Sequence, residues 1–376
     1  MSDLLVRGGT DVHGAPLDLA VVGGTVAHAP GPGAPVLDAT GLRVLPGLLD
    51  LQVNGAAGVD VTSEPHRLWE VGTALAAHGV TAWCPTVITS DAAAREAALH
   101  TLAGGPPAGW LGALPLGLHL EGPMISPARK GAHPEAWLAA PSPDLVAGWS
   151  RDAGVALVTL APELPRALDV VRALAGRGVV VAVGHTDATA EQVEAAFAAG
   201  AACVTHLGNA MPPVRPREPG PVGAALASEV TCGVIADGHH LHPAFLTAAW
   251  RALGPERFLA VSDTTAALGV PDGPARLGDQ DVVVAAGTVR LADGTLAGSA
   301  ASVVDCLRVL RATTGCSLAD AVATATSTPA RLVGDATRGS LAPGCRGDLV
   351  LVDDDLRVRA TVVGGRVVHR ADGEVG

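Results

Sequence analysis

The chain has 376 residues, of which 48% are hydrophobic and 16% charged, and its formal net charge is −12 at pH 7. It is long enough to bury a large core, and its composition favours a soluble α/β enzyme over a disordered or fibrous protein. The acidic balance, with no Tyr and three Phe, argues against a nucleic-acid partner. Because no apolar run approaches the ~18 residues of a membrane span and no signal-like segment opens the chain, we expect no membrane role. The six cysteines form no C-x-x-C pair, which favours small buried thiols in the reducing cytoplasm.

The first 45 residues contain short β-like segments that Gly and Pro interrupt, and residues 340–370 return to the same style. Together they predict a small β-sandwich built from both chain termini. We place the limits of its two parts at 1–45 and 336–376, with a catalytic domain over 46–335 between them.

Residues 46–335 alternate strand-like apolar runs with segments of helical period. Strands are expected over 48–54, 80–87, 114–121, 155–161, 179–185, 202–206, 232–237 and 258–263. Helices are expected over 65–78, 91–103, 163–175, 188–199 and 243–253, the fourth capped by Asp187 and ended by Gly200. Strands that are apolar throughout are typical of parallel sheets buried on both faces. Eight βα alternations therefore predict a (β/α)8 TIM barrel. A β-hairpin over 282–297, with its turn at Asp293 and Gly294, should precede helices over 299–313 and 317–326.

Five polar phrases follow these strands: HLEGP (119–123), GHTD (184–187), THLGNAMPP (205–213), ADGHHLH (236–242) and VSDTT (261–265). In a TIM barrel the carboxyl ends of the strands form the active site, so distant phrases should converge there. Glu121, His185 and His206 offer one carboxylate and two imidazoles. A catalytic divalent metal accepts this mixture while it keeps a position open for water. Asp263 would then supply a base.

Each of these residues also has a structural interpretation. His119 shares a strand face with Glu121, yet it could be a hydrogen-bonded core histidine while Glu121 pairs with an arginine. At least two of His239, His240 and His242 are expected in a loop or on the surface. Asp263 could instead cap the turn that follows it.

The five phrases, with KGAHP (130–134), REPG (217–220) and DGTLAGSAAS (293–302), occur in an order that resembles a known family. They resemble the amidohydrolase superfamily and, within it, the N-acetylglucosamine-6-phosphate deacetylases, from about Arg43 to Asp354. The resemblance implies a cytoplasmic homodimer that hydrolyses the acetamide of N-acetyl-D-glucosamine 6-phosphate to D-glucosamine 6-phosphate and acetate.

The resemblance also implies roles for individual residues. Glu121, His185 and His206 would bind the metal, and Asp263 would shuttle the proton. His240 would hold the acetamide carbonyl, and Arg217, from its own subunit or the neighbouring one, would bind the phosphate. The implied substrate-binding residues are Ala132, Asn209, Ala210, Arg217, Asp237, Gly238, His239, His240, Leu296, Ala297 and Gly298.

The end of the first barrel strand departs from a common pattern of the superfamily. Many amidohydrolases carry His-x-His there to hold a second metal, whereas this chain has Gln52-Val53-Asn54. Because amides bind divalent metals poorly, we expect one metal ion. Two histidines and one glutamate suit Zn²⁺, with Fe²⁺, Co²⁺ and Mn²⁺ as alternatives.

The sequence leaves other substrates open. The rivals are the epimeric N-acetylgalactosamine 6-phosphate, a cyclic amide and an N-acyl amino acid. A different class of function would be a non-catalytic barrel that serves as a binding or scaffold protein, against which the intact ligand set argues. A serine nucleophile is disfavoured because no G-x-S-x-G occurs.

Overall fold

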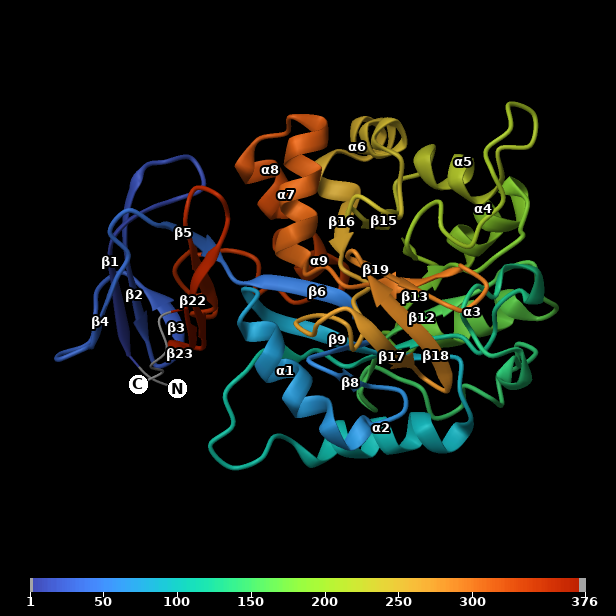
Figure 1. Cartoon of the computed structure of the whole chain (residues 1–376), viewed down its shortest axis with the longest axis horizontal. Coiled ribbons are helices and arrows are strands. Elements are labelled where there is room, and N and C mark those ends of the chain that lie inside the picture. The colour runs from blue at the N-terminus through green and yellow to red at the C-terminus, as the bar shows by residue number, and fades with distance from the viewer. Residues whose placement is uncertain (1–2, 372–376) are drawn as a thin grey trace.

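A computed structural model describes residues 3–371 of the chain. It contains a parallel α/β barrel, a sheet to which both chain ends contribute, and a small antiparallel sheet beside the barrel (Figure 1). The (β/α)8 barrel and the accompanying terminal β domain predicted from the sequence are thereby confirmed. No helix within these residues is long and apolar enough to cross a membrane.

Eight parallel strands of the described region form the barrel, and each predicted strand is present. They are β6 (Leu48–Val53), β9 (Val80–Ile88), β11 (Leu118–Glu121), β12 (Val155–Leu160), β13 (Val180–Val183), β14 (Cys203–Val204), β15 (Thr231–Ile235) and β16 (Phe258–Val261). The run expected over 114–121 is interrupted, because β10 (Leu114–Pro115) ends before Gly117, whose φ of 121° breaks the extended backbone. All nine residues of β9 are buried, as expected for a strand covered on both faces.

The barrel closes where β6 meets β16. The N–H of Asp263 donates to the carbonyl of Gln52 at 3.0 Å, and the N–H of Asn54 donates to the carbonyl of Thr264 at 2.7 Å. We call this junction of β6 and β16 the seam. Buried Asp50 also stabilises it, because its carboxylate accepts hydrogen bonds from the N–H groups of Gln52 and Ser262. The seam therefore places the carboxyl end of β6 directly beside Asp263.

Helices follow the strands and cover the outside of the barrel. They are α1 (Leu68–Ala76), α2 (Ala92–Gly104), α3 (Ala167–Ala175), α4 (Ala190–Ala199), α5 (Gly220–Leu226), α6 (Pro243–Arg257), α7 (Val303–Thr314), α8 (Leu318–Thr324) and α9 (Ser327–Leu332). Single turns of 3-10 helix occur at η1 (Pro65–Arg67), η2 (Pro127–Arg129) and η3 (Glu135–Trp137).

The helix α4 ends as predicted but begins later. Gly200 ends it with a left-handed φ of 117°, but the prediction that Asp187 caps its start is wrong. Thr189 is the cap: its side chain accepts the N–H of Gln192, and the Gln192 side chain accepts the N–H of Thr189. This reciprocal capping box satisfies the backbone N–H groups of Thr189 and Gln192, whereas the Asp187 side chain accepts a hydrogen bond from Arg129.

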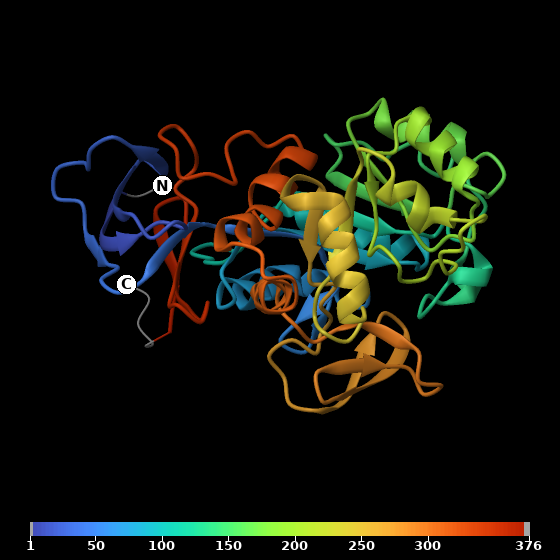
Figure 2. The ribbon, with the colours of Figure 1, turned by 90° about the horizontal axis from the view of Figure 1, so that it is seen from above.

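The terminal sheet joins the two ends of the chain (Figure 2). Its strands are β1 (Leu4–Thr10), β2 (Pro16–Val22), β3 (Thr25–Ala27), β4 (Val36–Asp38), β5 (Arg43–Pro46), β21 (Leu349–Val352), β22 (Val358–Val363) and β23 (Arg366–Arg370). β5 pairs with the antiparallel β21, so the last strand before the barrel lies beside the first strand after it. The domain limits at 1–45 and 336–376 remain our prediction, and their outermost residues, 1–2 and 372–376, lie outside the described residues.

The antiparallel sheet is larger than the expected hairpin. It contains β17 (Gly273–Leu277), β18 (Gln280–Ala285), β19 (Thr288–Arg290) and β20 (Leu296–Ser299), so the hairpin over 282–297 is only part of it. The turn at Asp293 and Gly294 does connect its last two strands. β17 escaped the prediction because it is short, contains Pro274 and alternates half-buried with exposed residues. A two-stranded ribbon of β7 (Gly55–Ala56) and β8 (Val59–Asp60) follows β6.

Candidate metal centre and active site

Four candidate site residues occupy equivalent places at the carboxyl ends of the barrel strands. Glu121 is the last residue of β11, and His185, His206 and Asp263 each lie two residues beyond the end of β13, β14 or β16. These three residues have positive φ angles of 48°, 30° and 50°. Left-handed backbone is uncommon for residues other than glycine and is characteristic of functional sites. The backbone thus turns into the left-handed region at the same position after three separate strands.

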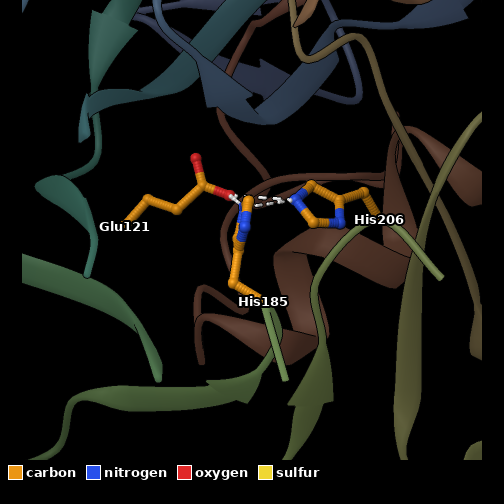
Figure 3. A group of neighbouring side chains, drawn as sticks. All are labelled: Glu121, His185 and His206. Carbon is orange, nitrogen blue, oxygen red and sulfur yellow. Dashed lines mark hydrogen bonds and ion pairs between the residues drawn. The ribbon is translucent and has the colours of Figure 1, made fainter. Parts of the chain in front are cut away.

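The side chains of Glu121, His185 and His206 converge on one point (Figure 3). Oε1 of Glu121 lies 3.2 Å from Nε2 of His185 and 3.0 Å from Nε2 of His206. The two Nε2 atoms are 3.0 Å apart. All three residues are buried, with at most 5% of their surface exposed.

This cluster fits a divalent metal. A tetrahedral Zn²⁺ with bonds of about 2.0–2.1 Å would hold its ligand atoms roughly 3.4 Å apart, close to the separations found here. Nδ1 of His185 donates to the carbonyl of Arg129 at 2.9 Å, which leaves the Nε2 lone pair free to face the centre. Nδ1 of His206 is buried without a hydrogen-bond partner among the described residues, so the polar contacts of this ring are made by Nε2.

The charges of the cluster also suit a cation. Burial alone would raise the pKa of Glu121, but hydrogen bonds and charge from His185 and His206 hold it well below its usual range. Burial would lower the pKa of His206, yet the hydrogen bond and charge of Glu121 raise it. Glu121 is therefore an ionised carboxylate, the form that binds metals. The sequence-based alternative of a Glu121–arginine pair is not what the structure contains.

Asp263 lies beside this cluster and only 7% of its surface is exposed. Burial, reinforced by the negative charge of Glu121, raises its pKa to about 7. Its Oδ1 accepts a hydrogen bond from Nδ2 of Asn54 at 2.8 Å, and the side chain caps no turn. A carboxyl group whose pKa lies near neutrality can both accept and return a proton.

His240 is oriented by a second carboxylate. Its Nδ1 lies 2.7 Å from Oδ2 of Asp237, while Oδ1 of Asp237 accepts the backbone N–H groups of His239 and His240. Burial would raise the pKa of Asp237, but the hydrogen bond and charge of His240 lower it. His239 and His242 are exposed, and His242 caps the start of α6, so two of the three histidines lie at the surface as expected.

His133 is a site residue that the sequence reasoning passed over. It is buried, its ring centroid lies 4.3 Å from that of His185, and its Nδ1 lies 2.8 Å from the hydroxyl of Thr89. Burial and the charge of His185 hold its pKa well below the usual range, so the ring is neutral. The KGAHP phrase (130–134) includes His133, but the sequence reasoning took only Ala132 from it, as a substrate-binding residue. His119, by contrast, is a core histidine hydrogen-bonded to Thr159.

A cavity of about 340 Å³ opens above these groups. Its walls include these predicted site residues: Glu121, Ala132, His185, His206, Asn209, Ala210, His240, Asp263, Leu296, Ala297 and Gly298. Asp237, Gly238, His239 and Arg217 do not line it. Arg217 is exposed in the loop before α5, whereas Arg129 lines the cavity and pairs with Asp187 at 2.8 Å.

A buried Glu-His-His cluster at the carboxyl end of a barrel, beside a carboxyl group of raised pKa, defines a metal-assisted hydrolase. Comparison with known proteins shows the family to which it belongs. The amidohydrolase family model matches residues 43–368, and the chain belongs to that family.

Relatives within the family share most of the chain. It is 40% identical to the human N-acetylglucosamine-6-phosphate deacetylase over 355 residues, which cover 89% of this chain and 85% of that protein. It is 38% identical to an N-acetylgalactosamine-6-phosphate deacetylase of Shewanella sp. (strain ANA-3), covering 87% and 83%. A solved N-acetyl-D-glucosamine-6-phosphate deacetylase mutant from Mycobacterium smegmatis, in complex with N-acetyl-D-glucosamine-6-phosphate, superposes with a TM-score of 0.87 at 35% identity. That match covers 98% of this chain and all of the other.

Proposed function

We propose that this chain hydrolyses the acetamide of N-acetyl-D-glucosamine 6-phosphate to D-glucosamine 6-phosphate and acetate. The observation that carries the proposal is the cluster of Glu121, His185 and His206 beside Asp263, in a cavity large enough for a sugar phosphate. The human relative that is 40% identical to this chain is named N-acetylglucosamine-6-phosphate deacetylase.

Glu121, His185 and His206 would hold the metal, with one ion per chain and Zn²⁺ as the expected element. When bound, it would act as a Lewis acid and lower the pKa of water. Asp263 takes the proton of the attacking water on its free oxygen, Oδ2. The same carboxyl group then gives the proton to the sugar nitrogen as the C–N bond breaks.

His240 holds the acetamide carbonyl in this account. Because ionised Asp237 only accepts, the proton between them belongs to Nδ1 of His240. Nε2 is the ring nitrogen that does not face Asp237, so it is the one left to contact the carbonyl. Asp237 thus orients His240 toward the oxygen on which negative charge develops.

The substrate phosphate meets Arg217 of the neighbouring subunit of a homodimer. This proposal is consistent with the position of Arg217, which is exposed and absent from the walls of its own chain's cavity. A guanidinium binds phosphate through two parallel hydrogen bonds, so the contact is both strong and oriented. We place the enzyme in the cytoplasm, where phosphorylated amino sugars are retained by their charge.

Acetate release from matched substrates tests the proposed reaction. We expect the highest kcat/KM with N-acetyl-D-glucosamine 6-phosphate, a lower value with the 6-phosphorylated galactosamine epimer, and the lowest with unphosphorylated N-acetylglucosamine. N-acetylgalactosamine 6-phosphate is the main rival substrate, because a 38% identical relative is named N-acetylgalactosamine-6-phosphate deacetylase. A reversed order for the two epimers would transfer the proposal to it, and no acetate from any of the three would contradict a deacetylase.

A further inference from the structure

The side chains of Gln52 and Asn54 both reach the reacting groups. They lie at the carboxyl end of β6, Gln52 within the strand and Asn54 directly after it, where many amidohydrolases carry His-x-His. Each has 2% of its surface exposed. Residues two apart on a strand point to the same face, here toward the barrel axis. We call Gln52 and Asn54 the amide pair.

Each member of the amide pair contacts a different functional carboxylate. Nε2 of Gln52 donates to Oε1 of Glu121 at 3.2 Å, the oxygen that also faces both histidines. Nδ2 of Asn54 donates to Oδ1 of Asp263 at 2.8 Å. No other described residue donates a hydrogen bond to the Asp263 side chain, so Asn54 alone determines which of its oxygens is engaged.

We infer that the amide pair has two separate positioning roles, which rest on the proposed function. Gln52 orients Glu121 toward the metal, whereas Asn54 holds Oδ1 of Asp263 so that Oδ2 faces the cavity and carries the proton. Neither amide touches the substrate bond itself.

The orientation of Asn54 supports this assignment. Ionised Asp263 only accepts hydrogen bonds, so Asn54 must present its NH₂ group to it. The other end of the amide, Oδ1, is then buried without a partner among residues 3–371, although Asn54 lines the cavity. A residue selected only for packing would not be expected to leave a buried acceptor unpaired. The backbone of Asn54 already secures the seam through Thr264, so its side chain is free for this role.

Single substitutions distinguish the two roles. Asn54→Ala should lower kcat by about tenfold or more with little change in KM or metal content, because Asp263 loses its anchor. Gln52→Ala should weaken metal binding by about 10–100-fold, measured by competition with a coloured chelator rather than by activity. Each variant serves as the control for the other, and equal effects of both on metal affinity and kcat would overturn the division of roles.

A double-mutant cycle tests whether Asn54 acts through Asp263. In the Asp263→Asn background, Asn54→Ala should cost less than about twofold in kcat, because the group it positions is already lost. The same loss in both backgrounds would overturn the inference. If Asn54→Ala folds poorly, the near-isosteric Asn54→Asp replaces it: a carboxylate cannot donate to Asp263, and a carboxylic acid would compete for its proton. Full activity of Asn54→Asp would also overturn the inference, whereas full activity of Asp263→Asn would contradict the proposed function instead.

Discussion

At the scale of single residues, the account depends most on Asp263. Asp263→Asn keeps the shape of the side chain but cannot accept a proton, so we expect kcat to fall by about 10²–10⁴-fold. Metal content should be unchanged, because Asp263 is not among the clustered ligands. Steady-state acetate release together with elemental analysis checks both statements. Wild-type turnover in this variant would exclude Asp263 as the base.

The pH dependence follows from the same group. Burial and the charge of Glu121 raise the pKa of Asp263 to about 7, and a base works only when ionised. Activity should therefore rise with pH along an acidic limb whose midpoint lies at or below about 7, since a bound cation favours the carboxylate. The limb should be lost in the residual activity of Asp263→Asn. An unchanged limb in that variant would assign the titration to another group.

The sequence predicted the three clustered side chains better than the groups that surround them. Glu121, His185 and His206 follow strand-like runs, and strand ends in a barrel converge. The hydrogen bonds of Gln52, Asn54 and His133 depend instead on tertiary contacts. Asn54 meets Asp263 because β6 lies beside β16, Gln52 reaches Glu121 at the end of β11, and His133 contacts Thr89 from a loop. Arg217 and His239 were selected by resemblance alone, and in the single chain they lie outside the cavity.

At the scale of elements, the start of α4 gives a direct test of the capping assignment. Thr189→Ala removes the acceptor for the N–H of Gln192 and should lower the free energy of unfolding by about 1 kcal/mol. Asp187→Ala is the matched control two residues earlier, and it breaks only a half-exposed pair with Arg129, worth roughly 0.2–1 kcal/mol. Urea unfolding of both variants measures the difference. A larger loss for Asp187→Ala would restore Asp187 as the cap.

The positions of helices and strands were predictable where the hydrophobic pattern of the sequence determines them. All eight barrel strands are buried runs, so their positions could be predicted to within a few residues. The antiparallel sheet was underestimated because β17 and β18 alternate exposed residues with half-buried or buried ones over only five or six positions. The capping box at Thr189 was readable in principle, since Thr189 and Gln192 have its spacing, but Asp187 was chosen from residue type alone.

At the scale of the whole molecule, the phosphate contact couples two subunits in our proposal. Arg217→Ala should raise KM far more for the phosphorylated sugar than for the unphosphorylated one, because only the former pairs with the guanidinium. An equal effect on both substrates would indicate a structural role.

Dimers that combine two different variant chains test whether Arg217 acts in its own subunit or in the neighbouring one. Combining Arg217→Ala with Asp263→Asn chains should recover part of the activity, since one cavity of the mixed dimer then has both an intact Asp263 and a partner's Arg217. No recovery in confirmed mixed dimers would place Arg217 in its own subunit's site.

The central claim is that one metal ion, held by Glu121, His185 and His206, makes this barrel a deacetylase. The most direct test is a titration of metal-free protein with Zn²⁺ while acetate release from N-acetyl-D-glucosamine 6-phosphate is followed. The account predicts that activity rises linearly and reaches its plateau at one equivalent per chain. Full activity without metal, or a plateau only at two equivalents, would contradict it.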